Sequence, residues 1–133
     1  MEATMLLCDY ADEVGGKLYI MGGGWSQAGA NMPLTLALAV KLLIPWDQTN
    51  KRHAMKAQLV TEDGAPVEQD GKPVVIEGEV EAGRPPGIVP GTPIDAPIAL
   101  RFNSLVLEPG GYRWEFQINH ETIARASFKT VTR

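Results

Sequence analysis

The segment 107–118, Leu-Glu-Pro-Gly-Gly-Tyr-Arg-Trp-Glu-Phe-Gln-Ile, constrains the fold of this chain more than any other stretch. Pro109 cannot extend a strand ladder, and Gly110 and Gly111 allow the backbone to turn. From Tyr112 onward apolar and polar residues alternate strictly, as in a strand with one buried face. A tyrosine at the start of a strand that follows a crossover between sheets is typical of a tyrosine corner, whose hydroxyl bonds to the upstream backbone. The segment therefore predicts two packed sheets joined at a corner.

The same period of two recurs along the rest of the chain. All six even positions from 34 to 44 are Leu, Val or Ile, so we expect a long central strand there although Leu and Ala favour helices. The chain predicts an all-β, immunoglobulin-like antiparallel β-sandwich of roughly eight strands with Greek-key connections, built by residues 1–133 as a single domain. The expected strands are 5–10, 17–21, 34–44, one that begins near 52, 74–82, 98–107, 112–118 and one that follows a short turn at 119–120.

Several irregularities interrupt this pattern. The segment 83–97 holds five prolines and three glycines, so we expect a long surface loop. A change of phase at Asn103 and Ser104 predicts a bulge. The glycines 22–24 indicate a bulge or a close backbone approach, because the spacing of a dinucleotide site and the lysine of a phosphate loop are missing. Asp47 is expected to be the N-cap of a single helical turn.

Composition and charge limit the partners of this chain. Cys8 is the only cysteine, which rules out an intrachain disulfide and a thiolate metal cage and favours a reducing compartment. Acidic residues outnumber basic ones by 16 to 12, giving a net charge of −4 that opposes binding to nucleic acid. Apolar runs are too short to cross a membrane, and the first twenty residues lack the features of a secretory signal. We expect no nucleic-acid and no membrane partner.

The loop 46–53 is the densest cluster of polar and aromatic side chains. The candidate ligand- or partner-binding residues are Trp46, Asp47, Gln48, Asn50, Arg52 and His53 in this loop, together with Arg84. An aromatic platform beside amide, carboxylate and guanidinium groups can orient a polar ligand. Alternatively the loop is a self-bonded turn, which the general rule that polar turn residues bond locally favours. Arg84 lies on a stiff proline-rich arm, which either docks on a neighbour or wraps on its own domain.

The sequence does not contain a recognisable catalytic or metal-binding constellation. Ser26, Ser104 and Ser127 lack the context of a nucleophile elbow, and His53 and His120 are the only histidines that can serve as bases. No pair of histidines or cysteines has the spacing of metal ligands. We expect no catalytic residue, no metal and no cofactor.

A resemblance to a family is carried by segments spread over nearly the whole chain. These are residues 9–11, 16–19, 22–25, 46–50, 83–87, 90–93 and 109–112. Together they resemble an uncharacterised family of short bacterial and phage-encoded proteins, a domain of unknown function. The resemblance implies a stand-alone sandwich domain and transfers no catalytic residue. The corner also resembles immunoglobulin-like domains, which is an analogy of fold alone.

The expected function is that of a noncatalytic protein-interaction or structural module, in the cytoplasm or in a virion. Its partner is another protein or copies of itself, in a repetitive assembly such as a phage capsid decoration. Outward charges, acidic at 77, 79 and 81 and basic at 113, 125 and 129, either keep the strands soluble or join complementary copies. The alternative function is a small-molecule-binding or hydrolytic protein that uses the 46–53 loop.

Overall fold

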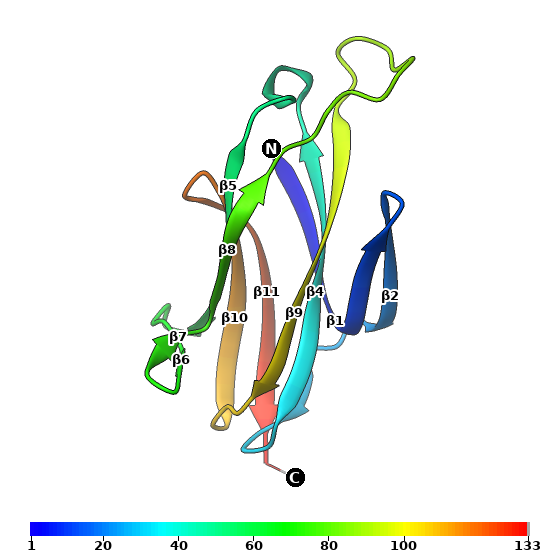
Figure 1. Ribbon diagram of the computed structural model, residues 1–133. Helices are drawn as coiled ribbons and strands as arrows, with labels where there is room; N and C mark the ends of the chain where they lie inside the picture. The colour runs from blue at the N-terminus through cyan, green and yellow to red at the C-terminus, as the bar shows by residue number, and fades with distance from the viewer. Residues whose placement is uncertain (133) are drawn as a thin grey trace.

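The computed structural model describes residues 1–132, which form strands, turns and one short 3₁₀ helix, η1 (Trp46–Gln48), without an α-helix (Figure 1). The prediction of an all-β chain is confirmed. The strands are β1 (Glu2–Val14), β2 (Lys17–Gly23), β3 (Gln27–Gly29), β4 (Leu34–Ile44), β5 (His53–Thr61), β6 (Glu68–Gln69), β7 (Lys72–Pro73), β8 (Val75–Val80), β9 (Ile94–Leu105), β10 (Gly110–Ile118) and β11 (Glu121–Val131).

Eleven strands lie within the described residues, against the roughly eight expected by the spacing of turn signals. The additional ones are β3, β6 and β7, which have two or three residues each. Segments of that length are too short to show a period of two, so the sequence pattern could not reveal them.

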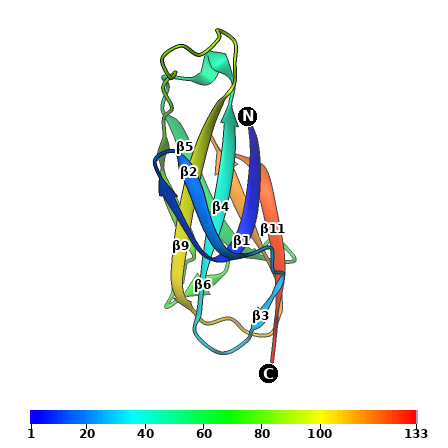
Figure 2. The same ribbon diagram turned by 90° about the vertical axis from the view of Figure 1, so that its right-hand side faces the viewer.

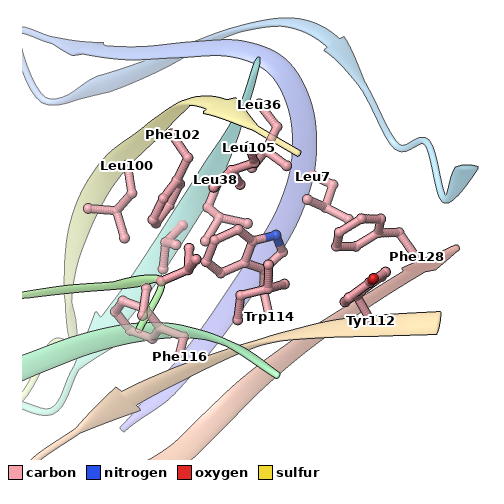
Figure 3. Close-up of a cluster of buried hydrophobic side chains, with 14 of the residues drawn as sticks. Leu7, Leu36, Leu38, Leu100, Phe102, Leu105, Tyr112, Trp114, Phe116 and Phe128 are labelled. Carbon is pink, nitrogen blue, oxygen red and sulfur yellow. The ribbon is translucent and has the colours of Figure 1, made fainter. Parts of the chain in front are cut away.

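Two larger sheets enclose a shared apolar core. One has four strands in the order β2-β1-β4-β9, and the other has five in the order β3-β11-β10-β5-β8, while β6 and β7 form a small separate pair. Core side chains come from both large sheets, with Phe102 of β9 facing Trp114 of β10 at 4.2 Å between ring centroids (Figure 3). Burial of these aromatic and aliphatic groups is the main stabilising term of such a fold.

The strand β4 has the bounds that the alternation predicted. Leu36, Leu38, Val40, Leu42 and Ile44 are all fully buried. The intervening positions 37 and 39 are also buried, because another element of the same curled sheet covers the outer face of β4.

That element is the β1–β2 hairpin, which folds back across the outside of β4 and β9 (Figure 2). β2 and β9 contact each other although they stand at opposite ends of the strand order, so the four-stranded sheet is curled. Small side chains allow the close approach, and a second apolar cluster contains Cys8, Ala11, Ala37 and Ala39. Cys8 is fully buried and its thiol donates to the carbonyl of Ala37, so it is a small core residue as predicted.

The corner at residues 105–112 connects the two sheets. β9 ends at Leu105 in the four-stranded sheet, and β10 begins at Gly110 in the five-stranded one. The hydroxyl of Tyr112 donates to the carbonyl of Glu108 at 2.7 Å. Burial, together with the nearby Glu108 carboxylate, raises the pKa of Tyr112, so this hydroxyl stays protonated and remains a donor at neutral pH.

Several expected boundaries are wrong, since β1 spans 2–14 and not 5–10, and β8 spans 75–80 and not 74–82. The proline-rich loop ends before Ile94 rather than at Pro97, because β9 already includes Pro97 opposite Lys41. β9 is an edge strand, and an edge leaves alternate N–H groups without a ladder partner, so proline is tolerated there. The N-cap of η1 is Pro45, not Asp47, and no side chain caps the helix.

The predicted bulge and turn are confirmed. Between Leu34 and Leu36 the register on β9 shifts by one extra residue, and Ser104 has a positive φ of 56°. Asn119 and His120 both have positive φ in the tight turn between β10 and β11. At Gly22 the backbone has positive φ, and an added Cβ would collide with the side chain of Asp9, which is the close approach expected there.

Candidate functional site

The structure brings Arg84 onto the 46–53 loop. Its guanidinium carbon lies 3.7 Å from the centroid of the Trp46 ring. Nε of Arg84 donates to Oγ1 of Thr49 at 2.7 Å, and Nη2 donates to the carbonyl of Trp46 at 2.8 Å. The planar cation therefore both stacks on the ring and bonds beside it, and it fastens the proline-rich arm to η1. We call this arrangement the arginine clasp (Trp46, Thr49 and Arg84).

His53 is buried beside the arginine clasp with both ring nitrogens in hydrogen bonds. Nε2 lies 2.8 Å from the carbonyl of Gln48, and Nδ1 lies 3.0 Å from the amide nitrogen of Asn119. A carbonyl accepts and an amide nitrogen donates, so these partners fit the neutral ring with its proton on Nε2. Neither nitrogen retains a free lone pair for a substrate proton or a metal.

Asn119 is a structural residue that sequence reasoning missed. It lies in the β10–β11 turn at positive φ, and its Oδ1 accepts from the backbone N–H of Ala54 at 3.0 Å. Its side chain thus links this turn to the start of β5 and to His53. An asparagine in a predicted tight turn was the available signal, but its partner is 66 positions away in the sequence.

The other predicted site residues lie around the arginine clasp. Asp47 and Gln48 line a hollow of about 420 Å³ that also contains Asn119 and Glu121. The backbone N–H of Asn50 donates to the carbonyl of Ala82 at 2.8 Å. Arg52 is exposed, with its Nε 4.0 Å from carboxylates of Glu79 and Glu81, an ion pair of little energetic value.

A second hollow, of about 310 Å³, lies near the opposite end of the five-stranded sheet. Its polar lining includes Glu62, Arg113, Ser127 and Lys129. Arg113 is paired with Glu115 at 3.0 Å, and the lining within the described part of the chain includes no histidine that could activate Ser127. Among residues 1–132 there is also no group of three His, Cys, Asp or Glu side chains placed to hold a metal ion.

The β1–β2 hairpin carries most of the exposed large apolar side chains, which the sequence analysis did not identify. Six of the ten exposed large apolar side chains in the described residues belong to it, and we call them the hairpin patch. They are Leu6, Tyr10, Val14, Tyr19, Ile20 and Met21. The signal was available in the sequence, since 18–21 are four successive apolar residues without the polar face of a half-buried strand.

The buried cluster of small side chains and the polar contacts of Arg101 join the hairpin to β4 and β9. Nη1 of Arg101 donates to the hydroxyl of Tyr10 at 3.0 Å and lies 3.9 Å from a carboxylate oxygen of Asp12. The hairpin patch is therefore presented on a fixed element rather than on a free arm. No helix of the described chain is long and apolar enough to span a bilayer.

Comparison with known families adds one result. The chain belongs to a family of unknown function, DUF6941, whose model matches residues 3–131. No curated protein matches the sequence. The expected membership in an uncharacterised family is confirmed, and for this DUF6941 member the functional argument depends on its own residues.

Replacement of Arg84 by lysine tests the arginine clasp. We expect the free energy of unfolding to fall by about 1 kcal/mol, because lysine keeps the charge but loses the stacked plane and the paired donors. Quenching of tryptophan fluorescence by acrylamide should rise, since Trp114 is fully buried whereas Trp46 loses its cover. Arg52→Lys, at a side chain that is 78% exposed, is the control and should change neither quantity. Unchanged quenching in Arg84→Lys would contradict the stacking.

Proposed function

We propose that this DUF6941 member is a noncatalytic protein-interaction or structural module whose hairpin patch contacts another protein chain. The hairpin patch is the observation that carries the proposal. Apolar side chains scattered singly over a surface are ordinary, but a concentration on one hairpin is typical of a protein contact. Met21 is 67% exposed, Val14 is 56% exposed and Tyr19 is 55% exposed, so much of their surface remains for a partner to bury.

The arrangement of the candidate loop supports this function over ligand chemistry. In the arginine clasp the face of Trp46 is covered by Arg84, and both nitrogens of His53 are bonded within the protein. A ligand platform or a general base requires these groups to be free. The loop therefore serves to close one end of the fold.

The fold that we propose is an immunoglobulin-like antiparallel β-sandwich with Greek-key connections. Support comes from the chain crossing between the two sheets after β4, after β8 and after β9, and from the hydroxyl bond of Tyr112 to the upstream backbone. Domains of this architecture present partner surfaces on strands and end loops. A place in a repetitive assembly such as a phage capsid decoration, in the cytoplasm or the virion, is the specific form of the proposal.

A matched pair of variants tests the proposed function in extracts of the source cells. Met21→Lys places a charge in the hairpin patch, and Val89→Lys places the same charge on a loop residue that is 70% exposed. We expect the wild-type chain and Val89→Lys to sediment with a larger protein complex, and Met21→Lys to lose that association. Sedimentation of all three chains as the same free species would overturn the proposal.

A further inference from the structure

We propose that β2 pairs antiparallel with β2 of a second copy, about a two-fold axis at Ile20. This inference rests on the proposed function, because it names the partner of the hairpin patch. Within the described chain β2 pairs with β1 alone, so its other edge offers backbone N–H and C=O groups to a new strand.

The other sheet edges carry devices that prevent such pairing. The edge strand β3 has three residues, which is too short to act as a template. β8 presents exposed Glu77 and Glu79, and β9 contains Pro97. Charges, proline and short length are the usual protections of a sheet edge. β2 has seven residues and no proline, and between its charged first residue, Lys17, and Gly22 with its positive φ, residues 18–21 carry no such protection.

The sequence of β2 is self-complementary in this register. A two-fold pairing of the extended part of β2, centred on residues 19–21, places Ile20 opposite Ile20 of the second copy. Tyr19 then lies opposite Met21 of the second copy, and this pair occurs twice, which joins an aromatic ring to a thioether as such groups prefer. Lys17 of each copy lies at an opposite end of the contact, so the two lysines do not repel each other.

Acidic residues on β1 do not oppose the contact. Asp9, Asp12 and Glu13 lie on β1, the strand that pairs with β2 on the side away from the second copy. Three strand spacings separate β1 from β1 of the second copy, roughly 14 Å. That distance exceeds the Debye length of about 8 Å at physiological salt, so repulsion between the two copies is largely screened.

The size of the contact indicates weak association. A pairing along the seven residues of β2 is at most roughly 24 Å long. Such a strip covers roughly 400 Å² on each chain, about half of the area in a standard interface. We therefore expect a reversible dimer that forms at roughly 10 µM to 1 mM, and not an obligate one. Because a two-fold contact uses the same surface on both copies, it closes at two chains, and a repetitive assembly of such dimers needs contacts at other surfaces.

Variants with opposite charges at Ile20 test this pairing. Sedimentation equilibrium of the purified full chain measures their association. The wild type should move from 14.4 kDa toward twice that mass with rising concentration. Ile20→Lys and Ile20→Glu should each raise the dissociation constant about tenfold or more, because like charges then face each other across the axis. An equimolar mixture should recover the dimer mass, since lysine then faces glutamate. Val89→Lys and Val89→Glu are the matched controls, and each should associate like the wild type.

Two results would overturn the inference. A wild-type chain that stays at 14.4 kDa up to about 1 mM excludes pairing between copies. In that case the comparison of Met21→Lys with Val89→Lys still decides whether the hairpin patch binds a different protein. A wild-type dimer that the Ile20 variants leave intact, or that their mixture fails to restore, excludes the two-fold axis at Ile20. The mixture also separates loss of pairing from misfolding, because misfolded chains would not restore one another.

Discussion

Replacing Trp114 by alanine should lower the free energy of unfolding by about 3–5 kcal/mol, the usual range for a large buried aromatic side chain. Trp114 is fully buried in the middle of β10 and faces Phe102 from the opposite sheet (Figure 3). Its removal takes away apolar burial and leaves a cavity that the two sheets cannot close without moving together. Urea unfolding followed by far-UV circular dichroism measures the change.

Two further variants separate burial from other effects of the substitution. Tyr19→Ala removes an aromatic ring that is 55% exposed and should change stability by less than about 0.5 kcal/mol. Trp114→Phe should lose less than half as much as Trp114→Ala. The indole N–H of Trp114 is buried without a hydrogen-bond partner in the described structure, so phenylalanine removes an unsatisfied donor while it keeps most of the apolar surface. Equal losses for the two Trp114 variants would contradict this account.

The parts of the fold that could be predicted are those in which local pattern and tertiary environment agree. Along β4 and β10 one face is apolar and buried, so the period of two identifies both strands within a residue or two. The curl of the four-stranded sheet could not be predicted in this way. Alanine is found on both buried and exposed faces, so the sequence pattern does not show that Ala37 and Ala39 are buried. They are covered by Cys8 and Ala11 of the β1–β2 hairpin.

Prediction of the candidate site had a similar limit. Composition and turn chemistry identified Trp46, His53 and Arg84 as a notable group. The hydrogen bond between Arg84 and Trp46 spans 38 positions, and the one between His53 and Asn119 spans 66. Contacts across such separations follow from topology, and local sequence does not encode them in a readable form. Residue types therefore identified the side chains that lie together, but they did not show that these side chains use their hydrogen-bonding groups on one another.

A second large loss of stability is expected at the corner, where two side-chain hydroxyls donate to the same carbonyl oxygen. Tyr112 Oη and Thr130 Oγ1 both donate to the carbonyl oxygen of Glu108, each at 2.7 Å. Tyr112 and Thr130 are both buried, and they lie on neighbouring strands, β10 and β11. Since a carbonyl oxygen has two lone pairs, the two bonds are compatible, and either one alone keeps the oxygen satisfied.

We therefore expect the double variant Tyr112→Phe with Thr130→Val to lose about 3 kcal/mol of unfolding free energy, whereas each single variant loses about 1 kcal/mol. The excess arises because only the double variant leaves the Glu108 carbonyl, whose two hydrogen bonds are part-buried, without either hydroxyl, and loss of the last partner costs more than loss of one of two. A double-mutant cycle by urea unfolding measures the coupling, with Tyr19→Phe as the control for loss of an exposed tyrosine hydroxyl. Additive losses would show that water replaces the hydroxyls at this carbonyl. The corner would then depend on the apolar packing of Tyr112 against Phe128, whose ring centroids are 5.7 Å apart, and not on its shared acceptor.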